Sequence, residues 1–520
     1  MKNALKGIGI VAATGLLLTG CSSGGGDATH NADGSTTLTV GVGSIPPMLD
    51  TVTTTYTPTG WMMRSVVETL ITSDSDYNIQ PMLADSWEAS ADGLSIVFHL
   101  REGVKFHNGD TMDADDVVAS MQRWNDNAAQ GLTAMPGAVW EKTDESTVTV
   151  TMQEPNAVAP LVLAGGGANI AAIYPKEIVE AAGSDPITDF IGTGPYTLAE
   201  YKPDETVRLE RFDDYSARSE TTDGLAGDRT GNYDEIDFIA VSDPQARIGG
   251  ALTGQYDITD IALEDYQQIV EADNLEPVTN FAGSLYLNYN KKMGPMSELG
   301  VRQAANAAIG SESVMQAVAS DPELFNIRSG IMQESQEALW NSDVDDATYN
   351  MNDPELAKEM LAETGYDGSP IRLLTQQGDK AAKGAVVVQQ QLEAAGFATD
   401  LTVIDPTSYI NKRDVPEDWD ILVAGMNSKL EPAAMTYFTP QFAGWTDDPT
   451  LTDVLTDYRN SESVEDAASK YGDILAAYDE YRPMTKIADW ADLLAVQKGM
   501  ESATVHDSYV VFWSVPLLED

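Results

Sequence analysis

Four histidines are the side chains in this 520-residue chain best suited to ligate a metal or to catalyse proton transfer at neutral pH. They are His30, His99, His107 and His506, and no two of them have the HxxH or HExxH spacing of a metal site. Carboxylate pairs occur throughout, because the chain has 82 acidic residues, so the paired carboxylates of a glycosidase cannot be recognised from spacing. We therefore expect no catalytic residue, no metal and no cofactor.

A glycine run, Gly165-Gly166-Gly167, has the composition of a phosphate-binding loop. It lacks the Lys-Ser/Thr pair that holds the phosphates and the magnesium ion in a P-loop. The run is therefore interpreted as a flexible loop.

The sole cysteine, Cys21, has the surroundings of a lipidation site. Two lysines precede a mostly apolar run from Ile8 to Leu18, and Leu18-Thr19-Gly20-Cys21 has the form of a lipobox. About a dozen apolar residues are too few to span a bilayer, which favours a cleaved signal peptide over a membrane helix. We predict a signal peptide over residues 1–20, a diacylglyceryl anchor on Cys21, and a flexible tether over residues 21–35 that is rich in Ser, Gly, Asp and Asn.

Acidic residues outnumber basic ones by 82 to 30, which gives a formal charge of −52. Removing residues 1–20 takes away two lysines, so the mature chain has 28 bases against 82 acids, or −54. Such a charge repels nucleic acid, and a nucleic-acid partner is excluded. The excess is spread along the chain, as expected for a solvated surface, and either colloidal solubility or a saline habitat would account for it.

The elements that would position a binding site alternate between strands and helices, which predicts an α/β fold. Period-2 runs predict strands, and apolar residues at helical spacing with capping residues at the ends predict helices. The expected strands are residues 36–42, 94–100, 147–152, 284–290, 371–375 and 399–404, and the expected helices are residues 113–124, 354–364, 380–395 and 464–481.

Several segments resemble the extracellular solute-binding proteins of bacterial ABC importers, family 5, which includes peptide, nickel and opine receptors. The strongest match is Leu83 to Arg123 (LADSWEASADGLSIVFHLREGVKFHNGDTMDADDVVASMQR). Further blocks follow in the family's order, and they are Gly192 to Tyr196 with Leu209 to Tyr215, Arg247 to Asp257, Leu287 to Ile309, Asp353 to Gly365 and Val387 to Gly396. Together they cover nearly all the chain from residue 36 to residue 520.

This resemblance implies a large, type II, periplasmic-binding-protein-like fold with two hinged lobes and an extra inserted subdomain. The first lobe would be discontinuous, with the inserted subdomain inside it and the second lobe between its last two segments. The implied division is residues 36–71, 191–282 and 496–520 for lobe I, residues 72–190 for the insertion, and residues 283–495 for lobe II.

The resemblance also implies where the solute binds. In relatives, the loop after the first strand and a late strand of the second lobe pair with the backbone of an extended peptide, and here these are Ser44-Ile45 and Gly425-Met426-Asn427. Tyr286, Gln376 and Arg413 fall near further pocket positions of the family. Met426 could equally be a core residue and Arg413 a surface ion pair.

One departure from the family concerns the solute. Peptide-binding relatives place an Asp shortly after the late strand, where it pairs with the peptide amino group. Here the segment is Ser428-Lys429-Leu430-Glu431-Pro432, so Ser428 or Lys429 stands at that position. A lysine would repel an ammonium, and a slip of one residue would let Glu431 serve as the anchor instead.

The sequence therefore predicts a solute-binding lipoprotein of an ABC importer, a monomer anchored at the extracytoplasmic face of the bacterial membrane. It would capture a small peptide or peptide-like solute and deliver it to a permease that works with ATPase subunits. The alternatives are an oligosaccharide, for which Trp61, Trp140 and Trp445 could form platforms, an anionic opine-like solute, a metallophore, and a secreted hydrolase.

Overall fold

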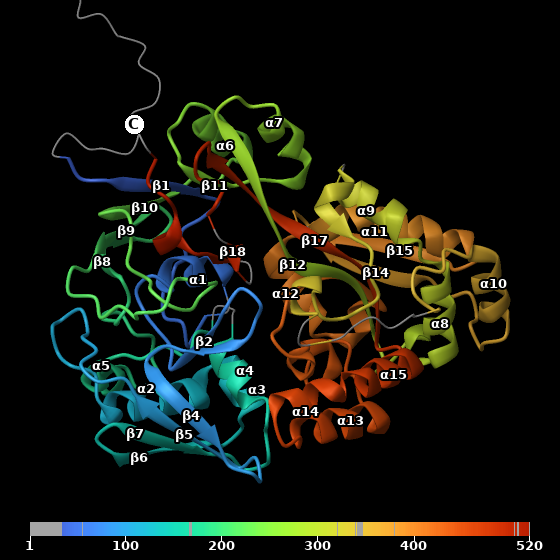
Figure 1. The fold of residues 1–520 in the computed structure, drawn as a ribbon. Coiled ribbons are helices and arrows are strands. Elements are labelled where there is room, and N and C mark those ends of the chain that lie inside the picture. Colours follow the sequence, from blue (N-terminus) through green and yellow to red (C-terminus); the bar gives the residue numbers. More distant parts are fainter. Residues whose placement is uncertain are drawn as a thin grey trace, which may run out of the picture.

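The computed structural model describes residues 34–518, except residues 55, 166–168, 320, 338–339, 341–346, 379, 504 and 507–508. The predicted signal peptide, Cys21 and His30 lie outside the described residues, as do Gly166 and Gly167. The chain forms two lobes, one built mainly from the first half of the sequence and one mainly from the second (Figure 1). No helix in the described part of the chain is long and apolar enough to cross a membrane.

A single large sheet runs through both lobes. Its order is β15-β14-β16-β12-β17-β11-β1-β10-β9-β8, and β13 pairs with β17 outside this path. Parallel pairing occurs where β1 meets β10 and β11 and where β14 meets β15 and β16, and the other pairs are antiparallel. The strands are β1 (Thr37–Val42), β8 (Tyr196–Lys202), β9 (Thr206–Arg211), β10 (Glu235–Ala240), β11 (Ile258–Asp260), β12 (Leu275–Tyr289), β13 (Phe325–Asn326), β14 (Ile371–Gln376), β15 (Thr399–Ile404), β16 (Ile421–Asn427) and β17 (Met484–Gln497).

Two long antiparallel strands, β12 and β17, carry the sheet from one lobe to the other (Figure 1). Their register runs from Leu275 opposite Gln497 to Asn288 opposite Met484. It shifts between Phe281 and Gly283 and again between Leu285 and Tyr286, and such bulges bend a strand pair. The predicted lobe boundaries stay a prediction, because these two strands belong to both lobes.

The first lobe packs short helices and a C-terminal segment against β1 and its neighbours. Val40, Phe238 and Trp513 lie in one buried core, so residues from both ends of the chain meet here. The elements around the sheet are α1 (Thr57–Met63), α6 (Pro244–Leu252), α7 (Tyr266–Val270), β18 (Val505–His506) and β19 (Tyr509–Val510).

The inserted subdomain has a four-stranded sheet and a core of its own. Ile96 and Phe98 of β5 point into this core while His99 is exposed, as the alternation predicts. Asp113 is the N-cap of α2 and forms a capping box with Asp116, so it precedes the first helical turn in which it was expected. The elements are β2 (Ile71–Ser73), β3 (Ile79–Pro81), β4 (Ala84–Ala89), β5 (Ser95–Leu100), β6 (Val139–Asp144), β7 (Thr147–Thr151), α2 (Ala114–Asn127), α3 (Ala129–Ala134), α4 (Ala159–Ala164) and α5 (Lys176–Ala182), with the main sheet in the order β4-β5-β7-β6.

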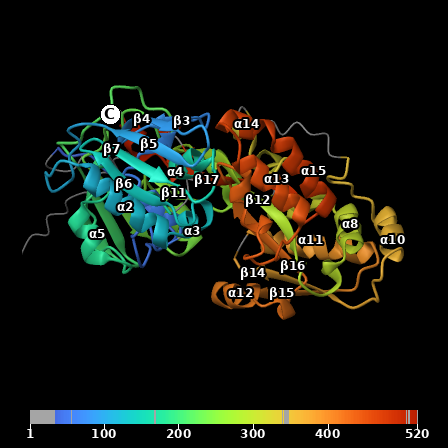
Figure 2. The ribbon, with the colours of Figure 1, turned by 90° about the horizontal axis from the view of Figure 1, so that it is seen from below.

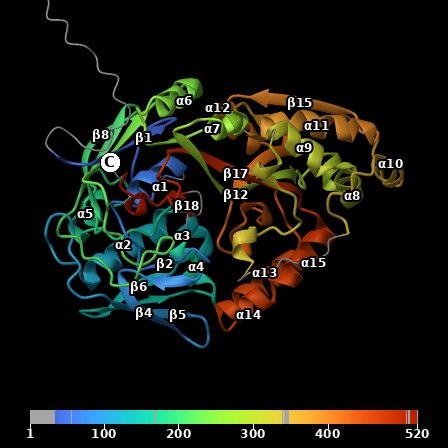
Figure 3. The same ribbon diagram turned by 45° about the horizontal axis from the view of Figure 1, so that its top comes forward.

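The second lobe covers its part of the large sheet with helices. α8 (Leu299–Ala308) and α10 (Pro354–Ala362) lie at the end of this lobe farthest from the first (Figure 2), and α14 (Val464–Ser469) lies beside the inserted subdomain (Figure 3). α10 begins at the expected residue because Asp353 accepts a hydrogen bond from the Leu356 amide. The other helices are α9 (Ser311–Val318), α11 (Lys380–Ala394), α12 (Pro406–Arg413), α13 (Pro449–Arg459) and α15 (Tyr471–Tyr481).

The prediction of one helix over residues 464–481 is wrong. The structure has two helices that meet at Lys470, whose backbone ψ of −1° departs from the α-helical value. Tyr471, Leu475 and Tyr478 nevertheless form the expected buried stripe on the second helix.

Candidate functional site

A narrow recess lies on the second lobe, where β12 and β16 pair. Ser284 of β12 lies opposite Met426 of β16 in the register, and the chain then continues from β16 into residues 428–435. A loop that contains Gln333 and Gln336 forms the other wall. The residues lining the recess are Ser284, Tyr286, Ile331, Gln333, Gln336, Met426, Asn427, Ser428, Lys429 and Met435.

A buried ion pair lies directly behind this recess. The ammonium of Lys486 is 2.7 Å from the Asp489 carboxylate, and both side chains are 1% exposed. Ser284 Oγ donates a hydrogen bond of 2.5 Å to the same carboxylate oxygen, Oδ1. Arg328 lies 3.8 Å from the other carboxylate oxygen. The pair therefore holds the Ser284 hydroxyl in place.

Burial controls the protonation of the groups around this pair. Desolvation lowers the pKa of Lys486, while the Asp489 carboxylate opposes that shift. Burial raises the pKa of the Tyr286 hydroxyl well above its usual value, and the charge of Asp489 raises it further. Tyr286 is therefore a neutral phenol at physiological pH.

Two glutamines hold the walls of the recess together. Gln333 Nε2 donates to Ser284 Oγ at 3.1 Å and to Asp489 Oδ1 at 3.4 Å. Gln336 Oε1 accepts from the Gln333 backbone amide at 3.0 Å, and Gln336 Nε2 donates to the Lys429 carbonyl at 2.8 Å. Sequence reasoning missed both glutamines, because they lie in a short 3₁₀ turn that has no periodicity or motif.

Trp490 explains the glycines on the strands next to the recess. A Cβ added to Gly425 would lie 1.9 Å from Cη2 of Trp490, and a Cβ added to Gly283 would lie 2.7 Å from its indole nitrogen. The indole therefore occupies the space that side chains at both positions would need. Gly425 is thus required by packing. It was predicted as a binding residue, and it lies on β16 beside the recess without lining it.

The recess brings together part of the predicted binding set. Tyr286, Met426, Asn427 and Lys429 all line it. Tyr286 is 1% exposed and packs edge to face on Tyr437, with ring centroids 6.2 Å apart. Met426 packs against an apolar core on its other side, so it is a core residue and a lining residue at once.

The remaining predicted residues lie elsewhere. Ser44 follows β1 in the first lobe and its hydroxyl is 2.7 Å from the Tyr56 hydroxyl, while Ile45 is 1% exposed in the core of that lobe. Gln376 ends β14. Arg413 ends α12, where it pairs with Asp414 at 3.0 Å and stacks 4.8 Å from the Phe442 ring. None of these four residues lines the recess.

The segment expected to carry an amino-group anchor supplies no carboxylate to the recess. Glu431 is 3% exposed, and its carboxylate accepts a hydrogen bond of 2.7 Å from the Ala433 amide. Burial raises the pKa of Glu431, and the charge of Arg459 opposes the shift. Glu431 is therefore a buried capping residue of the turn at Pro432, and no Asp or Glu is found among the residues that line the recess.

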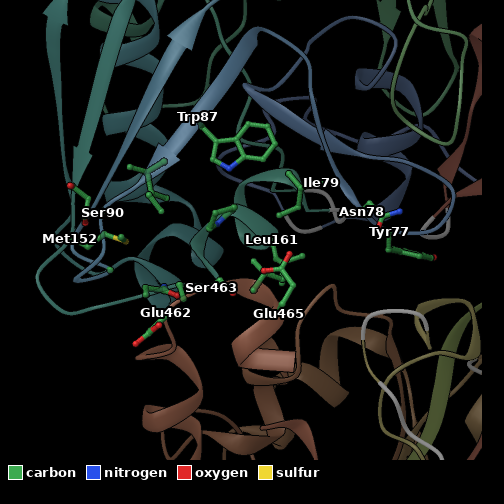
Figure 4. A pocket seen from close by; sticks show the side chains of 18 residues that line it. Tyr77, Asn78, Ile79, Trp87, Ser90, Met152, Leu161, Glu462, Ser463 and Glu465 are labelled. Carbon is green, nitrogen blue, oxygen red and sulfur yellow. The ribbon is translucent and has the colours of Figure 1, made fainter. Parts of the chain in front are cut away.

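A second, larger hollow of about 360 Å³ lies where the inserted subdomain meets the second lobe. It is lined from the inserted subdomain by Trp87, Ile79 and Leu161, and from the second lobe by Glu465 of α14 and by Glu462, which precedes that helix (Figure 4). No buried polar atom without a partner occurs among its lining residues in the described part of the chain.

Between the two hollows, the lobes touch directly. The Ala157 amide donates a 2.8 Å hydrogen bond to the Arg459 carbonyl. Nearby, Tyr77, Val158 and Leu161 share one apolar core with second-lobe residues such as Ile331. The structure is therefore one in which the inserted subdomain and the second lobe are in contact.

Two of the described histidines, His107 and His506, have structural partners. His107 Nε2 lies 2.9 Å from the Gly194 carbonyl and His506 Nε2 lies 2.9 Å from the Ser73 hydroxyl, and burial lowers the pKa of each to about 4. Within the described residues, no group of three or more His, Cys, Asp or Glu side chains could hold a metal ion.

Of the three tryptophans considered as sugar platforms, Trp140 is 3% exposed in the core of the inserted subdomain.

Comparisons with known proteins agree with this architecture. A family model for bacterial extracellular solute-binding proteins, family 5 Middle, matches residues 78–448. The chain is 27% identical over 388 residues to a probable peptide ABC transporter periplasmic-binding protein of Sinorhizobium fredii. The aligned residues are 72% of this chain and 71% of that protein. It is 26% identical over 474 residues to the oligopeptide-binding protein AppA of Bacillus subtilis, with coverages of 83% and 82%.

A solved structure extends the comparison to the fold. The PBP AgaA in complex with agropinic acid, from A. tumefaciens R10, superposes with a TM-score of 0.75 at 24% identity, over 92% of this chain and 96% of that chain. At this identity the likeness concerns the fold alone. The prediction of a two-lobed α/β fold is confirmed.

Proposed function

Because the chain belongs to family 5 of the bacterial extracellular solute-binding proteins, we propose that it is the lipid-anchored receptor of an ABC importer. In this proposal it captures a small peptide or peptide-like solute between its two lobes and delivers it to a membrane permease. The names of the relatives in Sinorhizobium fredii and Bacillus subtilis, a peptide transporter component and an oligopeptide-binding protein, support a peptide as the solute. We propose no catalytic step.

The observation that carries this proposal is the position of the recess next to a contact between the lobes. Tyr286 and Ile331 line the recess, and both belong to the apolar core that Tyr77 and Leu161 join from the other lobe. A solute that touches both lobes would stabilise the closed arrangement relative to an open one, since it gains its full set of contacts only there. β12 and β17 would serve as the hinge.

An anionic, opine-like solute is the second candidate. It is favoured by Lys429, which is one of the lining residues, and by the absence of acidic residues from the recess lining. A carboxylate in this place would gain a charge-assisted hydrogen bond, which is stronger than one between neutral groups. An oligosaccharide remains the third candidate of the same receptor class.

A thermal-shift screen of the full chain against di- to pentapeptides, oligosaccharides and opines tests the function. We expect one class to raise the unfolding temperature, and small-angle X-ray scattering should then show a smaller radius of gyration with the best solute bound. A solute that binds tightly without compaction would contradict capture by closure, and a screen with no binder in any class would contradict the receptor proposal. Detection of hydrolysed peptide or sugar products would instead favour an enzyme.

A further inference from the structure

The turn before α4 presents a backbone N–H to the second lobe. The Ala157 amide donates a 2.8 Å hydrogen bond to the carbonyl of Arg459, the last residue of α13. Asn156 holds this turn within the inserted subdomain, because its amide donates to the Gly93 carbonyl and its side-chain oxygen accepts from the Val158 amide at 3.2 Å. The last carbonyls of a helix have no partner within the helix. The inserted subdomain therefore completes the end of a helix that belongs to the second lobe.

The apolar side chains in and before α4 are divided between two cores. Ala159, Val162 and Leu163 lie in the core of the inserted subdomain. Val158 and Leu161 lie instead in a core that is formed largely by second-lobe residues, and each is 1% exposed. The inserted subdomain therefore does not need these two side chains for its own core, and separation of the lobes would expose them to water.

The contact between the inserted subdomain and the second lobe is small. Ala157 and Leu161 also line the larger hollow, so the two surfaces stand apart directly beside the contact (Figure 4). Glu462 and Glu465 line the second-lobe side of this hollow, and none of its described lining residues is basic. Domains that touch over a small area are expected to move relative to one another. We therefore expect this contact to break and to form again.

Arg459 joins this contact to the strand that lines the recess. Its carbonyl accepts from Ala157, and its guanidinium donates to the Ala433 carbonyl at 3.2 Å, in the turn that follows β16. β16 itself supplies Met426 and Asn427 to the recess. The inserted subdomain thus reaches the predicted solute strand through a single second-lobe residue.

We propose that the inserted subdomain is a clamp, formed by Ala157, Val158 and Leu161, that closes on the end of α13 without solute and thereby sets the apparent affinity for solute. The three residues position the lobes and do not touch the solute. Burial of one Val or Leu side chain favours the buried state by about ten- to a hundredfold, so loss of either contact should shift the lobes toward an open arrangement by a similar factor.

The effect on affinity follows from the closed fraction. A solute that gains its full set of contacts only in the closed arrangement has an apparent dissociation constant that is inversely proportional to the closed fraction. This part of the inference rests on the proposed function, whereas closure of the clamp without solute does not.

Closure is measured by double electron–electron resonance without added solute. Cys21 is the sole cysteine, so Cys21→Ser gives a chain free of thiols for labelling. Spin labels are attached at Glu141→Cys on β6 and Glu480→Cys on α15, two exposed positions on opposite sides of the contact (Figure 1). We expect a short-distance population that agrees with the structure. A single population at longer distance would overturn the clamp.

Two substitutions test the clamp residues, and a third is the matched control. Val158→Asp and Leu161→Asp each place a carboxylate in the apolar contact and should lower the ratio of short to long distances at least tenfold. Val158 is the N-cap of α4, a position that Asp favours, so this change should not weaken the helix. Leu132→Asp, on α3 of the same subdomain, changes a side chain that is 52% exposed and should leave the ratio unchanged.

The outcomes are distinct for the clamp and for the proposed function. Far-UV circular dichroism should show the same fold in all variants, and an unchanged distance distribution in both Val158→Asp and Leu161→Asp would overturn the clamp. Calorimetric titration of the best solute from the screen should give dissociation constants that rise as the closed fraction falls. Equal affinity despite loss of the short distance would overturn the role in affinity. Failure of every solute to bind, with the distances shifting as expected, would reject the proposed function and leave the clamp in place.

Discussion

Replacing Gly425 by alanine perturbs the site through packing alone. Gly425 lies on β16 opposite Leu285, and Trp490 fills the space in front of it. The added Cβ would be 1.9 Å from Cη2 of Trp490, whereas ordinary contacts begin at 3.4 Å, so ring or backbone must move by up to 1.5 Å, the difference between these values. The indole has little room to yield, because it also lies against Gly283 and is 6% exposed.

The magnitude follows from the usual cost of overpacking. One methyl forced into a filled core destabilises a protein by about 1–3 kcal/mol, and an overlap of this size belongs at the upper end. Replacing glycine by alanine also lowers the conformational entropy of the unfolded chain, which raises the free energy of unfolding by about 0.4–1 kcal/mol. We therefore expect the free energy of unfolding to fall by about 2 kcal/mol, measured by urea titration with far-UV circular dichroism.

Two comparisons make this prediction specific. Gly249 lies in the exposed face of α6, where an added Cβ meets nothing within 4 Å, so Gly249→Ala should be neutral or stabilising. Trp490→Phe makes space at the ring, and the double variant with Gly425→Ala should lose less stability than the two single changes added together. Equal midpoints for the Gly425 and Gly249 variants, or strict additivity in the double variant, would refute the packing argument.

Three further predictions concern the anchor, the charge and one buried acid. Cys21→Ser should release the mature protein from membranes without changing its unfolding midpoint, and membrane retention of this variant without lipid mass on wild-type Cys21 would refute the anchor. If self-repulsion from the charge of −54 on the mature chain opposes folding, the unfolding midpoint should rise between low salt and about 1 M NaCl, where the Debye length is about 3 Å, and a flat or falling profile would leave the saline-habitat explanation without support. Burial raises the pKa of Asp257 to about 6, so the folded state binds more protons than the unfolded state between about pH 4 and 6. The stability that the protonated Asp257 gives the folded state is therefore lost as pH rises through 6. Asp257→Asn should therefore raise the unfolding midpoint at pH 7–8 and reduce the loss of stability between pH 4 and 6, and an unchanged pH profile would contradict the assignment.

Local patterns predicted the elements whose structure depends on nearby residues. Alternation placed Ile96 and Phe98 in a core and His99 at the surface, because a strand has a period of two whatever surrounds it. The break at Lys470 was missed because the apolar stripe continues on both sides of it. Neither Gly nor Pro stands at that position to signal an end.

The recess was only partly predictable, since its polar parts come together over long separations in sequence. Met426, Asn427 and Lys429 could be placed from one strand and the family resemblance. Gln333 is 156 residues from Asp489, its partner in the structure, and no local pattern connects them. Trp490 was likewise not predicted as the reason for Gly425, because packing between strands leaves no periodic signal in either segment.

The shared sheet has a consequence for the order in which this protein folds. β17 places Val496 beside Ile258 in the first lobe and contributes Leu494 to that lobe's core, while its Ile487 lies in the core of the second. The first lobe therefore lacks a strand until residues 484–497 are available, although its first strand is made more than 400 residues earlier. Neither lobe can complete its sheet before residues 484–497 have been made, so final assembly is a late event that joins both lobes. Because the two lobes share these strands, global unfolding should be a single cooperative transition.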